Sequence, residues 1–563
     1  MPRVHAFTDD ALRDLDAVGL VRALHAGEVS APEVVDAAIA RTEAVDPELG
    51  AVAWRSWDRA RAEAGALRGG FFAGVPTFVK DNVDVAGMPT LQGTDAYVGR
   101  PAVRDGDFAR MYLATGLVAL GKTRLSEYGF NAACEHPRLG PVRNPWDPTR
   151  TAGASSAVSA ALVDAGAVPI AHANDGGGSI RIPAAVNGLV GLKPTRGRLA
   201  QDAMLRGQPV RIVSDGVVTR SVRDTAALLR EAEKVYRPLK LPPIGDITRP
   251  GKQRLRVAVH TGGAGRSADA DTVAATWRTA TLLEELGHHV EEVPAPVPDS
   301  FPDDFLLYWA TLAGALVAGG RRNHGRTFDR SRLDPLTMGL ARHAARSAHR
   351  IPGAIARLRR TAGQAERFHE RWDVALTPTL ASAAPPIGHL SPEPGFEQAV
   401  VGRQIALPGA IPLLDAQGIE GEHAEGLCPG FGDGIPDRRR VLGGAVDFPA
   451  QFAGERNPEQ GAGPARDLAF ETGRKPGFRQ VVIGERAEDL ARLRAEPFAV
   501  GEDPQQGLAV EEQHRRRRTW PGCPGRRPRS RRRRSGRGRA ARPGARSGAG
   551  AAPGPPPAYR HGR

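Results

Sequence analysis

Apolar side chains in the first fifty residues recur at the spacing of a helix. The segment Ser30-Ala31-Pro32-Glu33 has the S-x-x-E pattern of a capping box, with a proline early in the helix. After it, apolar residues return every three or four positions as far as Val45. We therefore predict an amphipathic helix that begins after Ser30 and ends at Asp46-Pro47.

From about Gly74 to Leu199 the pattern changes to short apolar runs. Residues 75–79 and 117–121 are typical of buried strands, and the stretch 158–165, mostly Ala, Val and Leu, is typical of a buried helix. Strands that alternate with helices predict an α/β fold whose sheet is largely covered on both faces.

The middle of the chain continues this pattern, and the end of the chain loses it. We predict one further strand at 255–259 and helices at 272–286, 305–318 and 355–372. Past about residue 395 the periodicity fades, and only 481–483 predicts a weak strand. The predicted organisation is a domain over 1–395 with a motif-rich core at 74–199, a poorly patterned region at 396–512 and a tail at 513–563.

The net charge of +14 comes from the tail. Residues 513–563 hold 17 arginines and no Lys, Asp or Glu, which leaves a net charge of −3 for the other 512 residues. Arg, Pro, Gly and Ala cannot bury enough apolar surface to offset an ordering entropy of about 1–2 kcal/mol per residue, so we predict a disordered tail. Because Trp520 and Tyr559 are its only aromatic residues, we do not expect this tail to bind nucleic acid.

Cysteine usage and hydropathy point to a cytoplasmic protein. Cys134, Cys428 and Cys523 show no disulfide or zinc spacing, and no run of 18 apolar residues occurs. The N-terminus has no apolar segment of the kind found in a signal peptide. We expect no metal, no membrane association and a reducing compartment.

Three short segments carry residues suited to nucleophilic catalysis. Residues 174–181, Asn-Asp-Gly-Gly-Gly-Ser-Ile-Arg, can direct successive N–H groups at an oxyanion, although most glycine triplets are simple turns. Ser155 and Ser156 precede a predicted helix, where a serine is commonly an N-cap. Lys80 follows a buried strand; a buried lysine can lose its proton and act as a base, whereas a lysine at a strand end can also extend to solvent.

Taken together, these segments resemble the amidase signature family. Four blocks occur in the family's order, at residues 74–82, 153–157, 175–184 and 191–195, and further similar stretches lie at 376–379 and 385–388. The resemblance implies an α/β/α sandwich around a large mixed sheet. It also implies a base at Lys80, a bridging serine at Ser155 held by a cis peptide bond, and a nucleophile at Ser179. The oxyanion donors implied are the N–H groups of Gly176, Gly177, Gly178 and Ser179.

This resemblance implies hydrolysis of a small linear or cyclic carboxamide to a carboxylate and an amine, through an acyl-enzyme and without a cofactor. The amino-acid sequence of residues 175–181, together with that of residues 135–141 upstream, looks most like the family branch that contains 6-aminohexanoate cyclic-dimer hydrolases. The chain departs from the family at Ala154, Ala157, Val158, Asn174 and Gly176. We interpret Asp175 and Arg181 as a structural ion pair.

Several alternatives stay open at this point. The chain could be a glutamine-hydrolysing subunit of an amidotransferase, which requires partner chains, or an inactive remnant; it could also form a homodimer. The composition past residue 395 is what translation of a GC-rich gene in a wrong frame produces, so we hypothesise a frameshift near residues 393–400. Resequencing the gene tests this hypothesis, which fails if no other frame restores amidase-like sequence.

Two other motif matches were weighed and set aside. Residues 116–123 fit the letters of the phosphate-loop pattern, but their apolar middle predicts a strand rather than a loop. The segment from His423 to Cys428 resembles a fragment of a deaminase motif, but the P-C-x-x-C element that this motif requires is missing.

Overall fold

The computed structural model describes residues 3–247, 251, 253–263 and 266–393. Its first elements are three helices and a strand: α1 (Ala17–His25), α2 (Ala31–Leu49), β1 (Val52–Arg55) and α3 (Trp57–Gly65). The predicted capping box is present, since the Ser30 side chain accepts from the Glu33 N–H and the Glu33 carboxylate accepts from the Ser30 N–H.

The predicted end of α2 at Asp46-Pro47 is wrong. The helix continues through Pro47 to Leu49, and its C-cap is Gly50, whose φ of 63° is left-handed. A proline removes one hydrogen bond from a helix, and here the conformation of Gly50 rather than Pro47 ends it.

Two three-stranded sheets form the centre of the domain. In one, β2 (Pro76–Lys80) pairs parallel with β3 (Val118–Thr123), and β3 pairs antiparallel with β1. In the other, β8 (Ser214–Thr219) pairs antiparallel with both β6 (Ile170–Asp175) and β7 (Val190–Leu192). Every residue of β2, β3, β6 and β8 is buried, as expected for strands covered on both faces.

Side chains rather than a backbone ladder link β2 to β6. The Thr77 hydroxyl donates to the carbonyl of Ile170 (2.9 Å), and the Lys80 N–H donates to Nδ1 of His172 (3.1 Å). The end of β2 is therefore held against the end of β6, which places Lys80 beside the glycine segment that follows β6.

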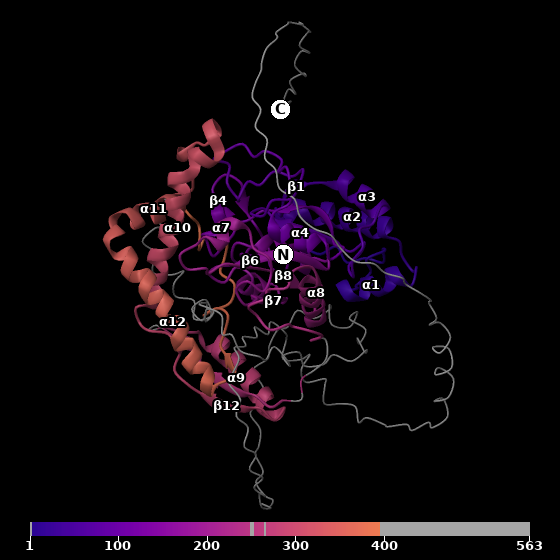
Figure 1. The fold of residues 1–563 in the computed structure, drawn as a ribbon. Coiled ribbons are helices and arrows are strands. Elements are labelled where there is room, and N and C mark those ends of the chain that lie inside the picture. Colours follow the sequence, from indigo (N-terminus) through magenta and orange to yellow (C-terminus); the bar gives the residue numbers. More distant parts are fainter. Residues whose placement is uncertain (1–2, 248–250, 252, 264–265, 394–563) are drawn as a thin grey trace, which may run out of the picture. The chain divides into compact units, whose positions relative to one another are not determined.

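Helices pack against these sheets and enclose one apolar core. They are α4 (Asp107–Leu113), α5 (Ala157–Asp164), α6 (Arg181–Val186) and α8 (Val222–Val235), whereas the short α7 (Ala203–Arg206) has no buried residue. All eight residues of α5 are buried, and its apolar side chains join those of α2, β2 and β6 in the core. The α/β class is thereby confirmed, as a set of mixed and antiparallel sheets covered by helices (Figure 1).

The later part of the described chain adds a small parallel sheet and four long helices. In the sheet, β9 (Arg256–Val259) lies between β12 (His289–Glu292) and β13 (Val374–Leu376). The helices are α9 (Ala270–Glu285), α10 (Phe301–His324), α11 (Pro335–Arg346) and α12 (Ile351–Arg371). The three predicted helices and the strand are confirmed with shifted ends; α11 was not predicted. Figure 1 shows α10, α11 and α12 as one group of helices.

Two pairings of two-residue strands and several isolated bridges complete the described fold. The short hairpins are β4 (Glu135–His136) with β5 (Gly140–Pro141), and β10 (Gly262–Gly263) with β11 (Arg266–Ser267). An isolated bridge pairs Arg150 with Pro386. The predictions for 396–512, 481–483, 513–563 and Cys428 lie outside the described residues. No helix of the described chain has the length and apolar character needed to cross a membrane.

Candidate active site

Lys80, the last residue of β2, is the centre of a buried polar cluster. None of its side chain is exposed. Its Nζ lies 2.8 Å from Oγ of Ser155, 2.8 Å from Oγ of Ser156 and 2.6 Å from Oδ1 of Asn174. The Asn174 main-chain carbonyl lies slightly farther away, 3.4 Å from Nζ. Neutral polar groups therefore surround the amine, and within the described residues no carboxylate contacts it directly.

This environment favours the neutral amine. Burial lowers the pKa of Lys80 from 10.5 to about 7, although the negative charges of Asp215 and Asp175 oppose the change. A large fraction of Lys80 is consequently free of its extra proton near neutral pH. The sequence prediction of a buried lysine, rather than one extending to solvent, is confirmed.

The two serines have different surroundings, although both contact Lys80. Ser155 lines the cavity described below, and Ser156 does not. Ser156 instead ties the start of α5 to β6, because its hydroxyl donates to the Asn174 carbonyl (3.2 Å) and accepts from the Asn174 N–H (3.3 Å). The substituted neighbours Ala154, Ala157 and Val158 are buried and leave the contact between Ser155 and Lys80 intact.

One expectation from the family resemblance is wrong for this structure. A cis peptide bond was implied at Ser155, but the described residues contain no cis peptide bond. The trans form is lower in energy by about 3–4 kcal/mol for a bond that does not involve proline. The trans backbone already brings both hydroxyls to 2.8 Å from Nζ of Lys80.

A buried carboxylate shapes the glycine segment between β6 and α6. Asp175 accepts from the N–H groups of Gly178 (2.7 Å) and Ile180 (3.2 Å) and forms a two-bond pair with the Arg181 guanidinium, both at 2.8 Å. The predicted ion pair is confirmed. Although burial raises the pKa of Asp175, the Arg181 charge and these hydrogen bonds bring it down to about 2.

Gly178 is the position where this turn requires a glycine. Its φ is +117°, and a Cβ there would lie 2.6 Å from Cδ1 of Ile182. Because its N–H is bound by Asp175, Gly178 is not available as an oxyanion donor, in contrast to the expectation from the family pattern. Within the described residues, no acceptor faces the N–H groups of Gly176, Gly177 and Ser179.

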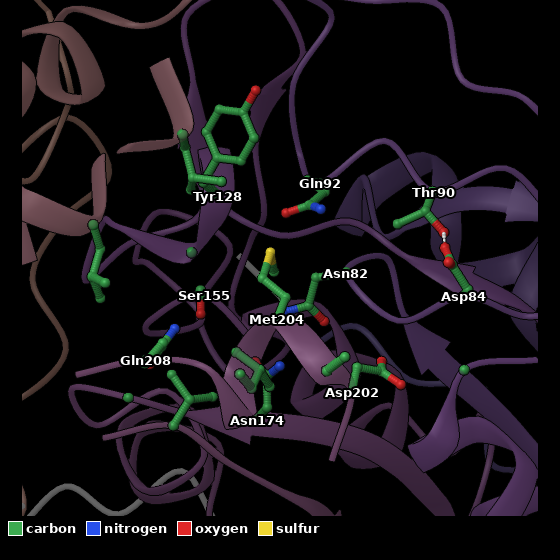
Figure 2. A pocket seen from close by; sticks show the side chains of 18 of the residues that line it. Asn82, Asp84, Thr90, Gln92, Tyr128, Ser155, Asn174, Asp202, Met204 and Gln208 are labelled. Carbon is green, nitrogen blue, oxygen red and sulfur yellow. Dashed lines mark hydrogen bonds between the residues drawn. The ribbon is translucent and has the colours of Figure 1, made fainter. Parts of the chain in front are cut away.

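A cavity of about 440 Å³ opens beside these groups. Ser155 and Asn174 lie along it (Figure 2), as do Gly176 and Ser179, so the two predicted serines line one cavity. In the described chain, no hydrogen bond joins the side chain of Ser179 to Ser155 or Lys80.

The lining of this cavity differs from one part to another. Neutral polar side chains come from Asn82, Thr90, Gln92 and Gln208, and carboxylates from Asp84 and Asp202 (Figure 2). Further charged lining residues are Asp105, Asp107, Arg104 and Arg110. Apolar side chains come from Tyr128, Phe130, Met204, Leu205, Val213, Trp309, Leu312 and Leu316. The cavity therefore suits a molecule with both polar and apolar parts.

Trp309 on α10, with Val213, forms the wall of the cavity beside Gly176. A Cβ added to Gly176 would lie 3.2 Å from the Trp309 ring, and the indole N–H donates to the Phe130 carbonyl (3.1 Å). The ring is thereby fixed against the residues that carry the free N–H groups.

Sequence reasoning did not assign a role to Ser156, His172, Asn174, Asp215 or Trp309. Ser156 precedes α5, His172 and Asn174 lie on β6, Asp215 lies on β8 and Trp309 lies on α10, so tertiary packing brings them to Lys80 and the glycine segment. The one available signal was Asn174, which departs from the family pattern beside the glycines.

Other candidate chemistry finds no support in the described residues. The phosphate-loop match ends in the buried strand β3, where Lys122 pairs with Asp81 (3.0 Å). The prediction that this stretch is a strand is confirmed. No group of three or more His, Cys, Asp and Glu side chains is arranged to hold a metal ion in the described part of the chain.

Comparison with known proteins agrees with this geometry. The family model described as Amidase matches residues 33–423. The AmiC protein of Mycobacterium leprae is 57% identical over 487 residues, covering 86% of this chain and 100% of that protein. The 6-aminohexanoate-cyclic-dimer hydrolase of Paenarthrobacter ureafaciens is 32% identical over 447 residues, covering 75% of this chain and 89% of that protein.

Solved structures show the same likeness. A structure of 6-aminohexanoate cyclic dimer hydrolase complexed with substrate has a TM-score of 0.65 and 29% identity, and the match covers 72% of this chain and 89% of that chain. A bacterial aryl acylamidase of the amidase signature family has a TM-score of 0.59 and 27% identity, and the match covers 66% of this chain and 81% of that chain.

Proposed function

The chain belongs to the amidase signature family and is an amidohydrolase, and on this premise we propose that Ser179 is its nucleophile, Ser155 its proton relay and neutral Lys80 its base. The proposed reaction converts a linear or cyclic carboxamide to a carboxylate and an amine through an acyl-enzyme on Ser179.

The arrangement of hydrogen bonds around Lys80 is the observation that carries this proposal. A neutral amine has two N–H donors and one lone pair. Oδ1 of Asn174 can only accept, so it takes one N–H. The Ser156 hydroxyl gives its proton to the Asn174 carbonyl, so its oxygen takes the other N–H. The lone pair then faces Ser155, which makes Ser155 the residue that gives a proton to Lys80.

The chemical steps follow from this direction of proton transfer. As Oγ of Ser179 bonds to the carbonyl carbon of the substrate, its proton passes to Oγ of Ser155, and the proton of Ser155 passes to Nζ of Lys80. The oxyanion faces the free N–H groups of Gly176, Gly177 and Ser179. When the carbon–nitrogen bond breaks, the same chain returns the proton to the leaving amine, and water then releases the acyl group.

The substrate proposal rests on the relatives and on the cavity lining. One relative is named for hydrolysis of the 6-aminohexanoate cyclic dimer, a neutral cyclic amide. The apolar side chains of Trp309, Leu312 and Leu316 line the same cavity as Ser179. We propose a neutral amide with an aliphatic or aromatic portion, for which cyclic amides, linear ω-amino acid amides and aryl amides are the test compounds.

The test is a Ser179→Ala variant of the full chain, assayed against these amides. We expect the rate of hydrolysis to fall by about 10³-fold or more, because the residue that forms the acyl-enzyme is lost. Ser30→Ala, which removes only a helix cap, should keep the rate. Retained turnover in Ser179→Ala would rule out the proposed nucleophile.

A fluorophosphonate probe separates an active enzyme from an inactive remnant. Mass spectrometry should find the label on Ser179 in the unmodified chain and no label at that peptide in Ser179→Ala. A folded protein that takes up no label would favour the inactive remnant.

A further inference from the structure

Asp215 on β8 is a buried carboxylate with no part in the proposed proton transfers. It is 1% exposed and lies opposite Asn174 in the pairing of β8 with β6. Its Oδ1 lies 3.3 Å from both Nδ2 of Asn174 and Nε2 of His172. Its Oδ2 has no hydrogen-bond partner in the part of the chain that the structure describes. Burial of a carboxylate without full hydrogen bonding costs folding free energy, so Asp215 is a candidate for a functional role.

Asp215 fixes the orientation of the Asn174 amide. A carboxylate only accepts hydrogen bonds, so the nitrogen of the amide must face Asp215 and its oxygen must face the other way. That oxygen lies 2.6 Å from Nζ of Lys80, the shortest contact of the amine. The amide therefore connects a negative charge on β8 to the amine on β2.

His172 is fixed by the same carboxylate. Its Nδ1 accepts from the Lys80 N–H (3.1 Å), so its Nε2 carries the proton and donates to Asp215. Asp215 thus determines the position of the Lys80 backbone through His172 and the position of its amine through Asn174.

We propose that Asp215 is a positioning residue for the base: through Asn174 and His172 it holds Lys80 so that the amine faces Ser155. This inference rests on the proposed function, since it assigns a purpose to the orientation of Lys80. Without Asp215, the Asn174 amide can rotate and present N–H groups to Lys80 instead of its oxygen.

The same residue adjusts how much of Lys80 is neutral. The titratable groups that face Lys80 are Asp215 on β8, Asp175 and His172 on β6, and Cys134 ahead of β4. Burial lowers the pKa of Lys80 to about 7, and of the opposing charges Asp215 is the largest. Asp215 therefore keeps the pKa of Lys80 from falling further, since a nearby negative charge favours the ammonium.

The test compares Asp215→Asn with the unmodified chain over a range of pH. An asparagine has nearly the same shape and keeps an acceptor for His172, but it carries no charge. We expect the midpoint of the rise in kcat/KM with pH to move downwards by about one pH unit, and kcat at its plateau to fall roughly tenfold because an uncharged amide oxygen holds Asn174 and His172 less firmly than a carboxylate does.

The matched control is Asp164→Asn, the same change at another buried carboxylate. Asp164 pairs with Arg3 (2.8 Å), away from the groups that face Lys80. Asp164→Asn should lower thermal stability and leave the pH midpoint unchanged. If both variants lose stability and neither shifts the midpoint, Asp215 is structural and the inference is overturned.

A second variant separates orientation from charge. Asn174→Ala removes the amide and leaves the Asp215 carboxylate in place, so kcat should fall while the pH midpoint stays within a few tenths of a unit of its original value. An unchanged kcat in Asn174→Ala would overturn the positioning role.

A spectroscopic measurement keeps this inference distinct from the proposed function. The ¹³Cε resonance of Lys80 reports its protonation directly, without turnover. If the titration midpoint of Lys80 measured in this way falls in Asp215→Asn, the inference is supported. If hydrolysis then follows a different pH dependence, the inference still stands but Lys80 is not the base. An unchanged Lys80 midpoint overturns the inference.

Discussion

At the scale of single residues, Lys80 illustrates how burial changes the chemistry of a side chain. In water its amine would carry a proton at neutral pH, but the described fold encloses it among two hydroxyls and an amide. None of these groups compensates a positive charge as a carboxylate would, so the neutral amine is favoured.

The first prediction concerns pH. Because only the neutral amine can accept a proton from Ser155, kcat/KM should rise with pH through a midpoint of about 7 and level off above it. Steady-state kinetics between pH 5 and 9 measure this curve. Lys80→Arg, whose side chain stays charged, should be inactive at every pH; activity in that variant that rises with the same midpoint would contradict the assignment.

The second prediction distinguishes two serines at equal distances from Lys80. Ser155→Ala should lower kcat/KM by roughly 10²–10⁴-fold, because it removes the proposed proton relay. Ser156→Ala removes one hydrogen bond worth about 1 kcal/mol and should cost less than about tenfold. Equal losses measured under the same conditions would show that the two hydroxyls share the role.

At the scale of elements, the turn from β6 to α6 depends on one ion pair. Asp175 organises the turn by accepting from two backbone N–H groups, and Arg181 at the start of α6 neutralises it. Both side chains are almost completely buried. Removal of one partner leaves the other charge without compensation inside the protein.

The third prediction follows from this pair. Arg181→Met should lower the free energy of unfolding by about 3–5 kcal/mol, as measured by urea denaturation, because Asp175 is left buried and charged. Asp175→Asn combined with Arg181→Met should restore part of the loss. In comparison, Arg61→Met breaks an exposed pair with Asp36 and should leave the unfolding curve nearly unchanged. A comparable loss in both single variants would argue against the importance of burial.

At the scale of the whole described molecule, the cavity depends on how the helices of the later part meet the central sheets. Glu127 lies at this junction. It accepts from the Thr94 hydroxyl (2.6 Å) and from the N–H of Asp334, the residue that caps α11 (2.8 Å). Burial, together with the charge of Asp334, raises the pKa of Glu127 to about 8.

The fourth prediction is a loss of stability as the pH rises from about 4.5 to about 8. The pKa of Glu127 in the folded protein lies above its ordinary value of 4.5. The contribution of protonated Glu127 to the free energy of unfolding is therefore fully present below about pH 4.5 and is lost as the pH rises to about 8. Glutamine cannot lose a proton, so Glu127→Gln avoids this loss. Between pH 5 and 9, the free energy of unfolding of Glu127→Gln should therefore increase relative to that of the unmodified chain as the pH rises. Parallel curves would exclude a protonated Glu127.

The sequence by itself determined the local features of this protein. Helix periodicity, the capping box at Ser30 and the buried runs of β2 and β3 depend on neighbouring residues, and all were predicted. The ion pair of Asp175 with Arg181 spans only six positions and was also predicted. The motif blocks identified the family, and with it the fold class, which the comparisons confirm.

Only the tertiary structure decided what surrounds each group. The continuation of α2 through Pro47 and the use of the Gly178 N–H by Asp175 depend on the packing around them. Asp215 lies 135 residues from Lys80 in the chain, and no periodicity relates the two. The pairing of β8 with β6 brings them together, because the electrostatics of a buried amine are set by neighbours in space and not in sequence.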